Sequence, residues 1–209
     1  MTENETGHKK RVGGLGMGIE TGDQLENSLK GQFLIAMPKM ADFNFSHTVT
    51  CISEHTRSGA LGIVINRVLP TVSGKSIFDE LKLECASGSA SIPIHIGGPV
   101  HANEIFILHG PPFSYESCLM ITNTLAMSNS MDIITAIAGR KGPDSFILSL
   151  GCAGWGPGQL EDELTQNAWL TCPVEEGILF NEPVESRWEA TVKMMGINPA
   201  LLSNTPGHA

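Results

Sequence analysis

One stretch of this chain combines residue types that could hold a ligand: Gly151-Cys152-Ala153-Gly154-Trp155-Gly156-Pro157-Gly158-Gln159-Leu160-Glu161. The apolar residues 146–150 precede it, so the pattern predicts a strand, a glycine-rich turn and then a helix whose first residue is Pro157. Free N–H groups at a helix N-terminus bind phosphates, and many phosphate sites use this order of elements. The segment therefore raises the question of a phosphate or nucleotide site.

Two features of the same segment argue against phosphate. A Walker loop needs a lysine followed by serine or threonine after its glycines, and none is present. Three carboxylates, Glu161, Asp162 and Glu163, fall in the early turns of the predicted helix, where they compete with an anion for the free N–H groups. Glycines that allow the backbone and Trp155 to pack closely explain the segment more economically.

Recognition of a small polar ligand is a second interpretation of this junction. Tryptophan, carboxamide and carboxylate groups cluster around it, and two strands elsewhere end in polar residues that could face the same cleft. The candidate ligand-binding residues are Asn66, His109, Trp155, Gln159, Glu161 and Asn167. The competing interpretation is that these groups satisfy the backbone donors of turns and helix ends.

No catalytic signature accompanies these residues. The chain has no G-x-S-x-G elbow, no H-E-x-x-H helix and no EF-hand loop. Glu54 and His55 are neighbours in a predicted strand, so their side chains point to opposite faces and do not pair with each other. An enzyme would need Glu54, His55, His109 or Glu161 to converge in the fold as acid and base. We assign no catalytic residue, and we expect no metal site and no cofactor.

Composition and charge restrict the classes of function. With 209 residues, 41% of them hydrophobic, the chain is expected to form one compact domain. The net charge is −9, and residues 161–189 carry eight carboxylates against a single cation, Arg187. Such a surface repels phosphate backbones, so direct binding to nucleic acid is disfavoured.

The chain shows no sign of export or of membrane insertion. No run approaches the roughly 20 apolar residues that span a bilayer, and the N-terminus lacks the apolar region of a secretory signal, so we expect a cytoplasmic protein that does not enter a membrane. Five cysteines, an odd number without a C-x-x-C pair, indicate neither a disulfide framework nor a structural zinc site. Residues 1–24 are polar and glycine-rich and are expected to be a disordered extension of a domain spanning residues 25–209.

The elements that must position the candidate residues are short and interleaved, which favours an α+β fold over a regular doubly wound sheet. The pattern predicts strands at residues 32–37, 48–55, 60–66, 93–96, 105–109, 119–122 and 146–150. Helices are expected at residues 25–29, 77–83 after a Ser76 cap, 131–138 after a Ser130 cap, 157 onward and 183–196, with a final turn after Asn198-Pro199.

The same landmarks give the chain a family resemblance. From about Gly31 to Ala209 it resembles the AlgH/YqgE family of bacterial proteins, and the matching residues are Phe33 to Pro38, Glu54-His55, Gly59 to Asn66, Gly97-Gly98-Pro99, His109, Gly151 to Glu161, Asn167 to Leu170, Arg187-Trp188 and Gly207-His208-Ala209. The resemblance implies an α+β domain whose branching mixed sheet folds into a pseudo-barrel with flanking helices. It also implies a cytoplasmic protein without an established biochemical activity, in a family of which one branch is named for regulating alginate synthesis. Cys152 departs from the aromatic residue common at that position.

Three functional hypotheses follow. The first is a non-enzymatic regulatory or interaction protein that acts through a protein partner or a small polar ligand. The second is an enzyme for a small polar substrate whose acid and base residues converge near the Gly151–Glu161 segment. The third is a transcriptional regulator that contacts DNA, which the charge of the chain disfavours.

Overall fold

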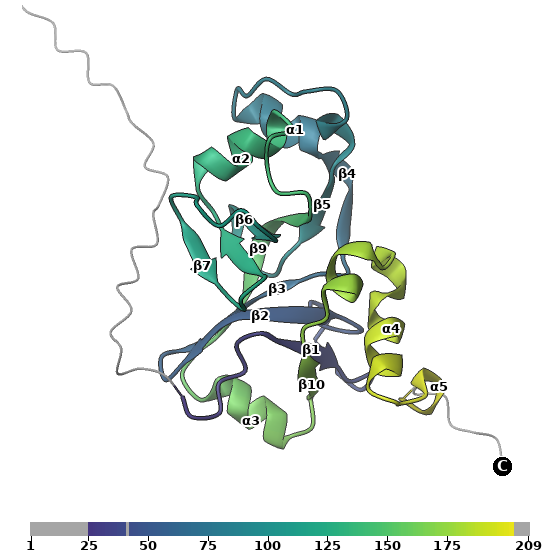
Figure 1. The fold of residues 1–209 in the computed structure, drawn as a ribbon. Helices are drawn as coiled ribbons and strands as arrows, with labels where there is room; N and C mark the ends of the chain where they lie inside the picture. The colour runs from purple at the N-terminus through teal and green to yellow at the C-terminus, as the bar shows by residue number, and fades with distance from the viewer. Residues whose placement is uncertain (1–24, 41, 203–209) are drawn as a thin grey trace, which may run out of the picture.

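The fold is an α+β domain built on one curled sheet, as the family resemblance implied (Figure 1). The computed structural model describes residues 25–40 and 42–202, so the predicted N-terminal extension lies outside the described residues. Along the sheet the strands follow the order β10-β1-β2-β3-β9-β6-β8-β7, and β5 and β4 branch from β9. The strands are β1 (Gln32–Ala36), β2 (Val49–Thr56), β3 (Gly59–Val64), β4 (Val68–Ser73), β5 (Pro93–Ile96), β6 (Val100–His109), β7 (Cys118–Met120), β8 (Ala126–Ser128), β9 (Phe146–Trp155) and β10 (Trp169–Pro173).

Strand β9 is the point at which the sheet branches. Its residues 148–150 pair in parallel with β5 and antiparallel with β6. Its residues 153–155 pair antiparallel with β3, which leads on to β2, β1 and β10. One strand of ten residues therefore joins the upper and lower groups of strands that Figure 1 shows.

The glycine-rich segment continues β9 as far as Trp155, so the predicted turn lies at Pro157 and Gly158 and not directly after residue 150. At Gly151 the backbone has φ +73°, and a Cβ would lie 2.4 Å from the Gly98 carbonyl oxygen. A Cβ on Gly98, where φ is +151°, would in turn lie 2.3 Å from the backbone of Cys152. The two glycines let two backbones touch at the branch point, which is a different use of glycine from chain reversal.

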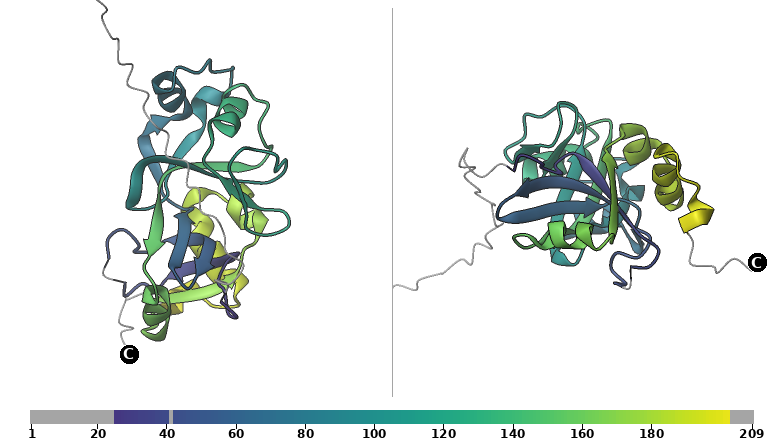
Figure 2. Two further views of the ribbon diagram at one scale, coloured as in Figure 1. Left: turned by 90° about the vertical axis from the view of Figure 1, so that its left-hand side faces the viewer. Right: turned by 90° about the horizontal axis from the view of Figure 1, so that it is seen from below.

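Helices close the sheet on three sides. They are α1 (Gly74–Glu80), α2 (Met131–Ala138), α3 (Gln159–Thr165), α4 (Arg187–Met194) and α5 (Pro199–Leu202). α1 and α2 share one apolar cluster with β5, β6 and β9. Residues of β1 alternate between two further clusters: Phe33 and Ile35 pack towards α4, whereas Leu34 and Ala36 pack towards α3. Figure 2 gives the view from below, in which α3 and the α4–α5 pair lie apart beside β1 and β2.

Most predicted elements are confirmed with shifted ends. Helix α2 begins after Ser130 as expected, and each predicted strand is found, but β6 begins at Val100, five residues early. The sequence pattern missed β4, β8 and β10. β8 is only three residues long and β4 is mostly exposed, so neither carries a strong apolar alternation.

Four helix predictions need correction. Residues 25–29 contain a turn and no helix, and the Leu29 N–H bonds to the side chain of His55 on β2. Helix α1 begins after Ser73 instead of Ser76, and α3 begins after Gly158, whose φ of +74° ends the turn that contains Pro157. The helix expected from Pro183 is a 3-10 turn, Val184–Ser186, followed by α4. Within the described residues no helix is long and apolar enough to cross a membrane.

Candidate functional site

The structure distributes the six candidate residues over three places. Trp155, Gln159 and Glu161 lie together where β9 meets α3, and Asn167 follows the end of the same helix with φ +56°. The other two do not join them: Asn66 lies beside α4, and His109 pairs with β8. The single cleft that the sequence allowed is therefore not formed.

At the β9–α3 junction one carboxylate organises the polar groups. Glu163 Oε2 accepts hydrogen bonds from the indole N–H of Trp155 at 3.0 Å and of Trp169 at 2.8 Å. Its Oε1 accepts from the Gln159 side-chain N–H at 2.9 Å, and the side-chain Oε1 of Gln159 accepts from the Gly156 backbone N–H at 3.0 Å. Glu163 is not among the candidate residues predicted from the sequence, although its spacing of four from Gln159 on a helix was a usable signal.

The two indoles of this junction are core residues. Trp155 and Trp169 are 5% and 3% exposed, and their ring centroids lie 6.0 Å apart. The Phe45 ring completes the group, 5.9 Å from Trp155 and 5.6 Å from Trp169. Because both N–H groups are used and both faces are covered, this cluster stabilises the fold and presents little surface to a ligand.

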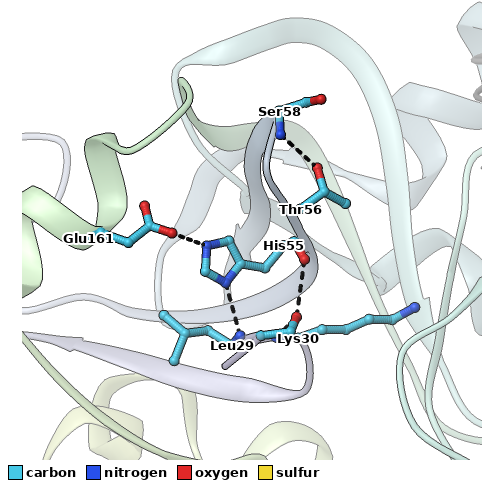
Figure 3. Close-up of polar contacts among 7 residues, drawn as sticks. Leu29, Lys30, His55, Thr56, Ser58 and Glu161 are labelled. Carbon is cyan, nitrogen blue, oxygen red and sulfur yellow. Dashed lines mark hydrogen bonds and ion pairs between the residues drawn. The ribbon is translucent and has the colours of Figure 1, made fainter. Parts of the chain in front are cut away.

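His55 and Glu161 converge as the enzyme hypothesis required (Figure 3). His55 Nε2 lies 2.9 Å from Glu161 Oε1, and His55 Nδ1 accepts the Leu29 backbone N–H at 2.9 Å. The acceptor role of Nδ1 places the ring proton on Nε2, which donates it to Glu161. Both nitrogens of a buried ring are thus occupied, so His55 fastens the N-terminal segment and α3 to β2 and has no nitrogen left to act as a base.

His109 belongs to a separate and fully buried pair. Its Nδ1 donates to the Gly110 carbonyl at 2.6 Å, so Nε2 accepts from the Ser128 hydroxyl at 2.9 Å. Burial lowers the pKa of His109, which keeps the ring neutral. The Ser128 hydroxyl, the His109 imidazole and the Gly110 carbonyl are arranged like a nucleophile, its base and the group that orients the base. However, Ser128 is 1% exposed and His109 is 0% exposed, so no substrate reaches them.

The thiol of Cys152 is buried in the core and is not an exposed nucleophile. Burial raises the pKa of Cys152 to about 11 and that of Cys51 to about 12. A thiol that stays protonated behaves as a small apolar group. In the described residues no three histidine, cysteine, aspartate or glutamate side chains are placed to hold a metal ion.

Asn66 lies in an open groove beside the C-terminal helices, called here the α4–α5 groove. Its volume is about 440 Å³, and the lining residues are His47, Asn66, Glu185, Trp188, Glu189, Pro199 and Ala200. The Asn66 carboxamide is used on both sides, because it accepts from the Val49 N–H and donates to the His47 carbonyl, each at 2.8 Å. Asn66 therefore shapes the wall of the groove and holds His47 at its unusual φ of +55°.

A buried cation supports the groove from behind. Arg187, 4% exposed, donates to the carbonyls of Ile65 and Glu182, and its guanidinium lies 3.4 Å from His95 Nε2. Burial and the neighbouring Arg187 lower the pKa of His95 to about 4. His95 is therefore neutral at physiological pH, whereas Arg187 interacts with the carboxylates of Glu182 and Glu185, which favour its charged form.

Comparison with known proteins shows which group of proteins shares this arrangement. The sequence profile described as AlgH-like matches residues 33–200, which include most of β1 and all of the branch strand β9, the β9–α3 junction and α4. The chain belongs to the AlgH-like family. A UPF0301 protein of Desulforapulum autotrophicum is 49% identical over 181 residues, covering 87% of this chain and 96% of that protein. A UPF0301 protein of Ralstonia nicotianae is 47% identical over 184 residues, with the same shares of both chains.

Two solved structures show the AlgH-like fold. The solution structure of the AlgH protein from Pseudomonas aeruginosa has a TM-score of 0.74 and 45% identity, covering 89% of this chain and 98% of that one. A crystal structure of a Corynebacterium diphtheriae protein has a TM-score of 0.66, covering 88% and 95%. At 20% identity the second likeness concerns the fold alone.

Proposed function

We propose that this AlgH-like chain is a non-enzymatic interaction protein that binds a partner through the α4–α5 groove. The observation that carries the proposal is the groove itself, in which Glu185 and Glu189 are exposed beside Trp188. Glu185 forms no salt bridge within the described residues, and Glu189 reaches only Lys193, at 3.2 Å between two exposed side chains. Such an exposed pair adds little stability, so both carboxylates are available to a partner.

The contrast with the rest of the chain supports a binding role. The histidine–glutamate pair at the β9–α3 junction and the serine–histidine pair on β6 and β8 are consumed by internal hydrogen bonds. A regulatory role through a partner fits the acidic surface better than contact with DNA, since residues 161–189 repel phosphate groups. The carboxamide of Asn66 is already used by the His47 and Val49 backbone, so it is not available to orient a small polar substrate.

Quantitative co-purification from the host bacterium tests this function. Ala200→Trp places a large ring on the exposed wall of the groove, and Gln166→Trp places the same ring on the exposed end of α3. We expect at least one protein to co-purify with the wild type and with Gln166→Trp and to be lost with Ala200→Trp. A partner retained by all three proteins would place the binding surface elsewhere and contradict the proposal.

A further inference from the structure

The residues of the α4–α5 groove select a particular kind of occupant. Building on the proposed function, we propose that the groove binds a basic, partly apolar segment of a protein partner. An arginine or lysine side chain of that segment lies between the carboxylates of Glu185 and Glu189 and against the ring of Trp188. The occupant is therefore defined by charge, by an aromatic contact and by a neighbouring apolar surface.

The charge of the groove favours a cation. The described residues that line it include two carboxylates and neither lysine nor arginine. Both carboxylates are four residues apart, on the 3-10 turn and the helix that follow one another, so they share one side of this segment. Arg187, the only cation in residues 161–189, points into the core and leaves the surface more acidic than its net charge of −7 suggests.

An aromatic surface forms the floor of the groove and is held rigidly. The Trp188 N–H donates to the Ala36 carbonyl at 3.1 Å, and the His47 ring lies 5.2 Å from Trp188 between centroids. The hydrogen bonds of Asn66 fix the His47 backbone. The aliphatic stem of an arginine or lysine side chain can pack against the small exposed part of the Trp188 ring while its charge reaches the carboxylates, and a floor that is already ordered loses little entropy on binding.

Apolar side chains beside the groove indicate a peptide segment and not a small organic cation. Leu201 follows the lining residues Pro199 and Ala200 on α5 and is 80% exposed. The segment that we propose therefore carries an apolar residue close to its basic residue.

Selection from a random peptide library displayed on phage, with the full chain as bait, tests this inference. We expect wild-type protein to enrich peptides that combine arginine or lysine with leucine, phenylalanine or another apolar residue. The synthetic peptide should bind the Glu185→Gln/Glu189→Gln protein about tenfold more weakly, as expected for the loss of two partly exposed charge contacts. Raising the ionic strength from about 0.1 M to about 1 M should weaken wild-type binding, because the Debye length falls from about 10 Å to about 3 Å.

A control variant removes two negative charges from a surface outside the groove. Glu80→Gln/Asp162→Asn neutralises two exposed carboxylates outside the groove and should leave the affinity unchanged. A consensus without basic residues, equal affinity for both double variants, failure to enrich any peptide, or binding of spermidine as strong as that of the peptide would overturn the inference. If the bacterial partner is lost with Ala200→Trp yet retained by the Glu185→Gln/Glu189→Gln protein, the proposed function stands and only this inference fails.

Discussion

The β9–α3 junction and the α4–α5 groove contain similar residue types in opposite arrangements. Each combines tryptophan with glutamate and a carboxamide. At the junction Glu163 accepts the N–H groups of both indoles, so the polar atoms are directed at one another. In the groove Glu185 and Glu189 face solvent, and the Trp188 N–H is used by the sheet behind it. The comparison teaches that residue types identify a candidate region, whereas the hydrogen-bond partners decide whether it can bind anything.

The largest effect should come from the glycines of the junction segment. Gly151 and Gly158 have nearly the same φ, +73° and +74°, but a Cβ at Gly151 meets backbone at 2.4 Å and a Cβ at Gly158 meets nothing within 4 Å. Gly158→Ala should cost about 1 kcal/mol for the backbone conformation alone, and Gly151→Ala should cost about 4 kcal/mol or prevent folding. Denaturant unfolding measures both, and equal costs would show that close backbone packing is not the purpose of Gly151.

Removing the central carboxylate of the junction should have the next largest effect. Glu163→Ala leaves two buried indole N–H groups without an acceptor, which we expect to lower the free energy of unfolding by about 3 kcal/mol. Asp162→Ala, an exposed neighbour on the same helix, should change it by less than about 0.5 kcal/mol. A Glu163→Ala protein as stable as the Asp162→Ala protein would mean that the junction is not an internally satisfied core.

Acid should weaken the support behind the groove. In the folded protein the pKa of His95 is lowered from its ordinary value of 6.5 to about 4. Between pH 6.5 and pH 4 the unfolded chain therefore binds a proton at this residue more readily than the folded protein does. Stability from this group is complete above about pH 6.5 and falls as the pH falls, by about 2 kcal/mol between pH 7.5 and pH 5. The difference in unfolding free energy between wild type and His95→Gln, measured at both pH values, should shift by this amount, and a constant difference would contradict it.

The smallest effect on stability should come from the groove. Glu185→Gln/Glu189→Gln removes exposed charges and one exposed salt bridge, so the free energy of unfolding should change by less than about 0.5 kcal/mol. Thermal unfolding of the double variant and of the Glu163→Ala protein under the same conditions compares the two losses of stability directly. Loss of more than about 2 kcal/mol would show that these carboxylates are structural, as Glu163 is.

The sequence predicted the elements near their true positions but not the partners of their side chains. Helix α2 could be predicted, because Ser130, the apolar stripe and Gly139 act within a few residues of one another. The turn was predicted to begin at Gly151 instead of Pro157, because the reason for that glycine, the backbone of Gly98, is 53 residues away in the chain. Local sequence patterns reflect interactions between residues that are close in the chain, whereas the approach of the Gly151 and Gly98 backbones is a long-range contact.

The candidate site shows the same limit. The residues of the β9–α3 junction were grouped correctly, because they are neighbours in the sequence. Asn66 was grouped incorrectly, because the sequence suggested a shared cleft with the junction, whereas the structure places it beside α4 and α5. The partnership of His55 with Glu161, 106 residues apart, could be stated only as one alternative among several.

Site-specific photo-crosslinking in the host bacterium tests the central claim most directly, that the α4–α5 groove and not the junction is the binding surface. A benzophenone amino acid is introduced at Ala200 in the groove or at Gln166 at the end of α3, both exposed positions. We expect discrete protein adducts from position 200, diminished by Glu185→Gln/Glu189→Gln, and none from position 166. Adducts from position 166 with none from position 200 would contradict it.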